Sequence, residues 1–227
     1  GFNLDFHTIR HHGEQVPLEE HYVASRSQRT RSVLTFFAQD HASTEMVYAN
    51  ADVTKAEQAK EVIAFADYWS RVAGADPGLL VFDSKLTTLP NLARLDDMHI
   101  TFLTLRARSP SLVRQIALLP ASAWRTVELD VPTRKYRFPR VHESQFTIAG
   151  HVFRQLFIQD LGHDQPTVLL TNDRKTGAAK VITRYAQRML IENALSDAVR
   201  FFHMNALSSA VGIKVDTVSK PWNGGYL

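Results

Sequence analysis

The 227-residue chain contains no cysteine. Disulfide bonds, zinc-thiolate sites and thiol nucleophiles are therefore excluded, and the composition is compatible with a reducing compartment. No apolar run approaches the roughly 20 residues that a membrane-spanning helix needs, and the first residues lack the apolar block of a signal peptide. The sequence therefore predicts a soluble, cytoplasmic protein without a membrane partner.

Several common catalytic motifs are also missing. No glycine-rich phosphate loop is present, and His7, His11 and His12 lack the helical HExxH spacing of a zinc protease. The segment VFDSKLT has Lys85 where a haloacid-dehalogenase-like phosphatase needs a second aspartate. The chemistry is therefore expected to come from another set of residues.

Positive charge is concentrated in clusters, although the net charge is only +3. Clusters of this kind on a nearly neutral chain favour a surface that binds a polyanion such as nucleic acid. The alternative for any single cluster is a solvated loop. The clusters are Arg26, Arg29 and Arg31; Arg106, Arg108 and Arg114; Arg134, Lys135, Arg137 and Arg140; and Arg174, Lys175, Lys180 and Arg184.

Strand-like runs open the chain. The segments Phe2–Ile9, Ser32–Ala38 and Met46–Val53 are rich in aromatic and β-branched side chains and are separated by turn or polar residues, which predicts antiparallel strands. A helix is expected over Thr54–Val72. Its first residue is the expected N-cap, and Glu57 is expected to complete a capping box.

An alternation of strand and helix follows. Leu79–Phe82 is a short continuous apolar run, typical of a strand buried on both faces, and it stops at Asp83. A helix near Asn91–Met98 leads to a second such strand, Ile100–Leu105. This order predicts a parallel pair of strands.

The pattern changes in the middle of the chain, where alternating segments without a helical period predict added antiparallel strands. The run Thr167–Leu170 is expected to return to the core sheet, and a helix over 184–203 to close the fold. The expected organisation is an α/β core whose first part is residues 1–120, a β-rich insertion at 121–164, the second part of the core at 165–215 and a tail at 216–227.

Three acidic residues stand where local structure explains them poorly. Asp5 lies in the apolar strand FNLDF, and Asp83 ends a buried strand at the edge where open α/β sheets present their ligands. Glu192 interrupts an apolar helix. Each can be a paired structural carboxylate. Together they favour a site for divalent cations, since hard oxygen ligands select Mg²⁺ or Mn²⁺.

Tyr185, Arg188 and Glu192 are spaced by three and four residues, so a continuous helix would carry them on one face. With LDFHTI and LVFDSKLTT, the segment RYAQRMLIENAL resembles the three catalytic blocks of bacterial insertion-sequence transposases of the DDE type, in the same order. The resemblance covers nearly the whole chain up to about Val215.

This resemblance implies an RNase H-like mixed sheet flanked by helices, with a β-rich insertion before the last catalytic helix. It implies that Asp5, Asp83 and Glu192 bind two Mg²⁺ or Mn²⁺ ions about 3.5 to 4 Å apart and that the protein cleaves and transfers DNA strands at the ends of an insertion element. The implied assembly is a bacterial, nucleoid-associated homodimer on element ends and target DNA. The expected DNA-binding residues are Tyr185, Arg188, Trp124, Arg134, Lys135, Arg137, Arg174 and Lys175.

The sequence departs from the family pattern in the last block. The family has a lysine seven residues after the glutamate, where this chain has Val199, and Arg200 is rotated by about 100° around the helix. The chain also resembles a catalytic core without the family's N-terminal DNA-binding part and with a shortened C-terminus. Two alternatives therefore stay open: a non-catalytic DNA-binding remnant and a stand-alone nuclease of the same fold.

Trp124 opens the expected insertion, close to a basic run. In related transposases with such an insertion, an aromatic side chain stacks on a base flipped out of the duplex, and Trp124 is the candidate for that role. The alternative is a tryptophan that packs the insertion onto the core, because tryptophans are usually largely buried.

Overall fold

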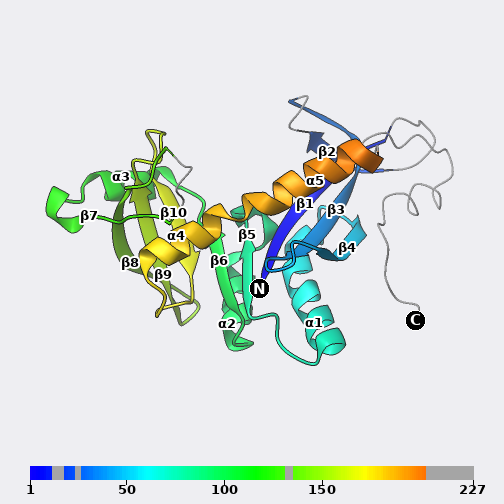
Figure 1. Ribbon diagram of the computed structural model, residues 1–227, viewed down its shortest axis with the longest axis horizontal. Helices are drawn as coiled ribbons and strands as arrows, with labels where there is room; N and C mark the ends of the chain where they lie inside the picture. The colour runs from blue at the N-terminus through cyan, green and yellow to red at the C-terminus, as the bar shows by residue number, and fades with distance from the viewer. Residues whose placement is uncertain (12–17, 24–26, 131–134, 203–227) are drawn as a thin grey trace. The chain divides into compact units, whose positions relative to one another are not determined.

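The chain folds into two compact units, each described by itself. The first unit contains Gly1–Pro77 and the chain from Met189 onwards, and the second contains Gly78–Arg188. Both combine strands with helices, which confirms the predicted α/β class (Figure 1). The structure is a computed structural model that describes residues 1–11, 18–23, 27–130 and 135–202. Within these ranges, no helix is long and apolar enough to cross a membrane.

An antiparallel sheet forms the centre of the first unit. Strand β3 lies between β1 and β4, with Asp5 opposite Phe37, and β2 pairs with the beginning of β3. The three predicted strands are confirmed, and β2 is additional to them. The elements are β1 (Phe2–Arg10), β2 (Glu20–Val23), β3 (Gln28–Asp40), β4 (Met46–Val53), α1 (Glu61–Ala73) and α5 (Met189–Phe202).

Helices α1 and α5 cover opposite faces of this sheet. Phe65 of α1 packs against Phe2 and Phe36, with ring centroids 5.2 and 6.4 Å apart. Ile191 of α5 packs in a buried cluster with Phe37, the next residue of β3. Successive residues of a strand point to opposite faces, so both faces of β3 are covered. Double coverage explains why this strand has a nearly continuous apolar sequence.

The first helix begins later than the sequence predicts. It starts at Glu61, after a 3-10 turn over Gln58–Lys60. Thr54 Oγ1 donates a hydrogen bond to Glu57 Oε2 at 3.4 Å, but the two residues close a turn and not a helix terminus. The predicted capping box is therefore wrong. Asn50 Nδ2 of β4 donates to Glu61 Oε2 at 3.0 Å, so a tertiary contact holds the first turn of the helix.

The second unit begins with the predicted parallel pair. Val81 of β5 lies opposite Leu103 of β6, and α2 connects the two strands. Strand β10 is antiparallel to β6, and β9, β8 and β7 follow by antiparallel pairing, as predicted for the insertion. The elements are β5 (Leu79–Phe82), α2 (Leu89–Asp97), β6 (Thr101–Leu105), α3 (Pro110–Ala117), β7 (Arg125–Thr126), β8 (Arg140–Ile148), β9 (His151–Gln159), β10 (Thr167–Thr171) and α4 (Ala178–Ala186).

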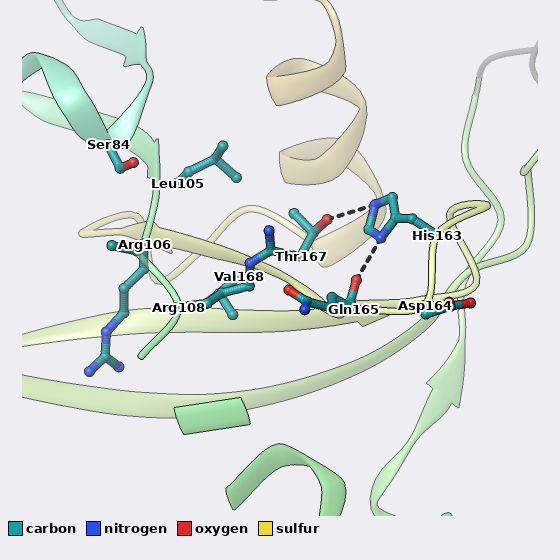
Figure 2. A pocket seen from close by; sticks show the side chains of 10 residues that line it. Ser84, Leu105, Arg106, Arg108, His163, Asp164, Gln165, Thr167 and Val168 are labelled. Carbon is teal, nitrogen blue, oxygen red and sulfur yellow. Dashed lines mark hydrogen bonds between the residues drawn. The ribbon is translucent and has the colours of Figure 1, made fainter. Parts of the chain in front are cut away.

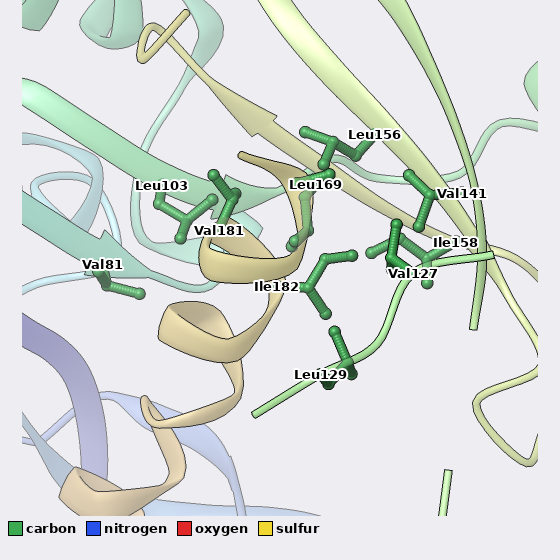
Figure 3. Close-up of a cluster of buried hydrophobic side chains, with 11 residues drawn as sticks. Val81, Leu103, Val127, Leu129, Val141, Leu156, Ile158, Leu169, Val181 and Ile182 are labelled. Carbon is green, nitrogen blue, oxygen red and sulfur yellow. The ribbon is translucent and has the colours of Figure 1, made fainter. Parts of the chain in front are cut away.

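Helices α3 and α4 cover opposite faces of the strands of this unit. Ile182 of α4 packs with Leu156 and Leu169 in a buried apolar cluster of this unit (Figure 3). Ile116 of α3 packs against Phe157, the residue after Leu156, on the other face. The insertion strands therefore share one core with β5 and β6.

The long C-terminal helix predicted from the sequence is interrupted. Helix α4 ends two residues before Arg188, and α5 begins one residue after it, so Tyr185 and Glu192 lie on different helices. The prediction that one helical face carries all three residues is wrong. Ile182 of α4 packs in the core of the second unit, and Ile191 of α5 packs in the core of the first. The two helices therefore belong to different cores.

Candidate active site

Two of the predicted metal ligands share one face of the first sheet. Asp5 lies opposite Phe37 in the β1–β3 pair, and cross-strand partners project to the same face. Phe37 packs against Ile191 of α5, and Glu192 is the next residue of that helix. Both carboxylates are half-buried, and Asp5 Oδ1 accepts a hydrogen bond from the Phe6 amide at 2.9 Å. Asp5 therefore lies on the face that α5 covers.

Asp83 belongs to the second unit, where it directly follows β5. Because β5 and β6 are parallel, both strands end at the same edge of the sheet, as the sequence predicts. Ser84 Oγ donates a hydrogen bond to Asp83 Oδ1 at 3.0 Å, which orients the carboxylate. The convergence of Asp83 with Asp5 and Glu192 involves both units and stays a prediction.

A cavity of about 540 Å³ opens at this edge, and Ser84, the residue after Asp83, is among the residues that line it (Figure 2). The parallel strands contribute their ends to it, and β10, which is antiparallel to β6, contributes its beginning. It therefore gathers residues that are up to 84 positions apart in the sequence. The lining residues are Ser84, Leu105, Arg106, Ala107, Arg108, His163, Asp164, Gln165, Thr167 and Val168.

Two arginines of the cavity are held in place by neutral partners. Arg106 Nη1 donates to Gln155 Oε1 at 2.5 Å, and its guanidinium carbon lies 3.7 Å from the centroid of the Phe146 ring. Burial lowers the pKa of Arg106, but a guanidinium stays charged at neutral pH. Arg108 Nη1 donates to the Pro166 carbonyl at 3.1 Å. These partners carry no negative charge, so both arginines can attract an anion.

His163 has its tautomer set by the loop before β10. Its Nδ1 lies 2.6 Å from the Gln165 carbonyl oxygen, which can only accept, so Nδ1 carries a proton. Its Nε2 lies 3.3 Å from Thr167 Oγ1, and in the neutral ring this nitrogen accepts from the hydroxyl (Figure 2). The sequence marks the two arginines as a basic cluster but misses His163 and Thr167, because only the register of β10 brings them to this edge.

The acidic residues fit a hard cation by donor chemistry, since carboxylate oxygens are the ligands that Mg²⁺ prefers. Within the described part of the chain, no group of three or more histidine and acidic side chains is gathered closely enough to hold a metal ion. The two-ion prediction therefore depends on the donor type of Asp5, Asp83 and Glu192.

Two of the predicted basic clusters lie at opposite ends of the β8–β9 hairpin. Lys135 and Arg137 precede the first residue of β8, whereas Arg174 Nη2 donates to the Val152 carbonyl beside the hairpin turn at 2.6 Å. Thr147, the partner of Val152 across the hairpin, lies seven residues after Arg140, the first residue of β8. The two ends are therefore ~23 Å apart at about 3.3 Å per residue. Lys175 is exposed next to Arg174. Arg134 lies outside the described residues, as do the tail 216–227 and the side chains of Val199 and Arg200.

Several cations of the insertion are paired within the protein. Arg137 Nη2 lies 3.1 Å from Glu128 Oε1, and Arg140 Nε lies 2.6 Å from Asp160 Oδ2. Exposed pairs of this kind contribute only about 0 to 1 kcal/mol, so a phosphate can replace the carboxylate at small cost. A basic sequence run is therefore less positive in the folded protein than its residue count indicates.

Tyr185 and Arg188 lie together at the end of α4. The Arg188 guanidinium carbon is 5.9 Å from the Tyr185 ring centroid, and Arg188 is 8% exposed. Tyr185 packs against the core cluster of the second unit. Their DNA-binding role stays a prediction.

Trp124 is half-buried and packs against the apolar cluster of α3 that contains Leu112 and Ile116. Its ring centroid lies 6.0 Å from that of His142 on β8. This contact supports the packing alternative, and base stacking by Trp124 stays a prediction.

Replacing Trp124 by alanine should lower the free energy of unfolding by about 2 to 3 kcal/mol, somewhat less than for a fully buried ring. Urea titration measures this loss, and Trp124→Phe, which keeps a ring, is the control. Unchanged stability combined with impaired strand transfer would instead indicate that the Trp124 ring stacks on a DNA base.

No protein-family model matches the chain, and no curated protein matches it. The transposase resemblance therefore depends on the three sequence blocks.

Proposed function

We propose that the chain is the catalytic domain of a DDE-type transposase with an RNase H-like fold. It would cleave and transfer DNA strands at the ends of an insertion element, as a homodimer that bridges two ends. The observation that carries this proposal is the position of Asp83 at the carboxyl edge of a parallel strand pair, directly before Ser84, which lines a cavity together with Arg106 and Arg108. The proposal assigns the Asp83 carboxylate to metal binding and the arginines to phosphate binding.

In this proposal, Asp5, Asp83 and Glu192 hold Mg²⁺ or Mn²⁺, which activates the attacking oxygen and stabilises the leaving oxygen when bound. The protein's own side chains position the DNA. Arg108 is anchored through one Nη1 bond to the Pro166 carbonyl, so its remaining N–H groups are available to phosphate oxygens. Ser84 orients the Asp83 carboxylate through the 3.0 Å hydrogen bond.

The test is a strand-cleavage assay with labelled DNA that carries the inverted repeats flanking the coding region, in Mg²⁺ and in EDTA. The proposal expects nicking and joining in Mg²⁺ only. Binding without cleavage would indicate a DNA-binding remnant, and cleavage without joining a stand-alone nuclease.

DNA affinity should fall steeply with salt, because each neutralised phosphate releases counterions. Replacing both Lys135 and Arg137 by glutamine should make the slope of log K against log salt concentration shallower by up to about 1.8, since each contact contributes about 0.9. Fluorescence anisotropy on a duplex at several salt concentrations measures this slope. The double variant Lys60→Gln and Arg71→Gln, on the exposed surface at the two ends of α1, is the matched control. Equal slopes for the two double variants would show that Lys135 and Arg137 are solvated side chains that do not contact DNA.

A further inference from the structure

A β ribbon in the insertion exposes two aromatic rings. Before β8 begins, the chain already runs beside the residues after β7: the Val127 amide donates to the Pro139 carbonyl at 3.0 Å, and the Leu129 amide donates to the Arg137 carbonyl at 2.9 Å. Val127 and Leu129 are buried in the core of the second unit, and so is Val141 of β8. The same alternation directs Tyr136 and Phe138 outwards. Arg137, opposite Leu129, begins on the other side, and its long side chain reaches Glu128 at 3.1 Å.

Two of the outward residues are aromatic, although an exposed sheet face is usually polar. Phe138 is 58% exposed and Tyr136 is 40% exposed. The sequence around them, Lys135-Tyr136-Arg137-Phe138, alternates cations with rings. Lys135 Nζ lies 5.5 Å from the Tyr136 ring centroid, and the Arg137 guanidinium carbon lies 5.7 Å from that of Phe138. Flat apolar surfaces and positive charge are therefore combined on one short segment.

The Tyr136 ring lies against the backbone of Gly162. Gly162 adopts a left-handed backbone conformation with φ of +89°, and a Cβ atom at this position would come within 2.3 Å of the ring. Only a glycine leaves room for the ring against the backbone. A side chain that is already held in place loses less conformational entropy when a ligand binds.

We propose that this segment, residues 135–138, is a stacking surface for the unpaired bases of single-stranded DNA. The rings of Tyr136 and Phe138 stack on bases, and Lys135 and Arg137 contact the phosphates, with Arg137 exchanging Glu128 for a phosphate oxygen. Rings interleaved with cations match what sequence-tolerant single-strand binders use, because every base has a π face. The choice of DNA as the nucleic acid rests on the proposed function.

The test measures binding of a fluorescent oligothymidylate of about 16 nucleotides by anisotropy, in EDTA so that no cleavage occurs. Phe138→Ala should weaken this binding by about 5- to 150-fold, which corresponds to the loss of one stacked base. The salt dependence should stay unchanged because no charge is removed. Gly162→Ala should also weaken binding, since it displaces the Tyr136 ring.

The matched control is Leu118→Ala, which removes an apolar side chain that is 84% exposed at the end of α3. It should bind like the unmodified protein. Phe138→Leu keeps an apolar side chain of similar size but lacks the π face, so it should also bind weakly, and this loss cannot be attributed to poor folding of the alanine variant. Oligothymidylate binding by both Phe138 variants at the level of Leu118→Ala would overturn the proposal, as would an equal loss on duplex DNA. Because no metal is present, failure of the cleavage assay leaves this result intact.

Discussion

Asp83→Asn should reduce Mg²⁺-dependent strand cleavage by at least about 10³-fold. Metal ions supply several kcal/mol of transition-state stabilisation, and about 4 kcal/mol corresponds to a factor of 10³ in rate. Asparagine retains the Oδ1 atom that accepts the bond from Ser84, so the thermal midpoint should change little. Single-turnover cleavage of labelled DNA measures the rate. Asp5→Asn and Glu192→Gln should cause losses of similar size, and combining them should add little because the three act as one unit.

The matched control for this experiment is Asp97→Asn, which removes an exposed carboxylate at the end of α2 in the same unit. It should cleave at the normal rate. A folded Asp83→Asn protein that also cleaves at the normal rate would contradict both the assignment of the ligand and the proposed mechanism.

The largest effect on stability is expected from Leu156→Ala. Leu156 is fully buried on β9, opposite Leu169 of β10, in the cluster that α4 covers. Removing its side chain should lower the free energy of unfolding by about 3 kcal/mol, the sum of lost transfer free energy and of a cavity that neighbouring side chains fill only in part. Urea titration, followed by circular dichroism, measures the change.

Leu118→Ala is the control, because it makes the same chemical change at a position that is 84% exposed. Its free energy of unfolding should stay within about 0.5 kcal/mol of the original. A Leu156→Ala protein as stable as Leu118→Ala would show that β9 does not belong to the core.

Local sequence patterns predicted most of the elements around the candidate site. The runs that became β5 and β6 are short, apolar and bounded by turn residues, and their boundaries agree with the structure within a residue. The position of Asp83 at the edge of the parallel pair follows from the same pattern, because the strand ends where the apolar run ends. Strand β2 was missed because its four residues, EHYV, carry no clear alternation.

The errors occur where a tertiary contact competes with a local preference. Thr54 and Glu57 have the spacing of a capping box, but the helix begins at Glu61, whose carboxylate accepts a bond from Asn50 of β4. The apolar period of the C-terminal helix continues through Arg188, yet the helix is interrupted there. Periodicity reports which residues are apolar; it does not report which core each of them joins.

The sequence by itself determined the α/β class, the positions of most strands along the chain, the three acidic candidates and the presence of basic clusters, because these depend on composition and on spacing over a few residues. Only the tertiary structure decided the environment of these residues. It placed the Lys135 and Arg174 clusters at opposite ends of a hairpin, paired Arg140 with Asp160 and brought His163 to Arg108 at one cavity. These relations involve residues that are 20 or more positions apart, and strand register and packing set the distances between them, which no local pattern encodes.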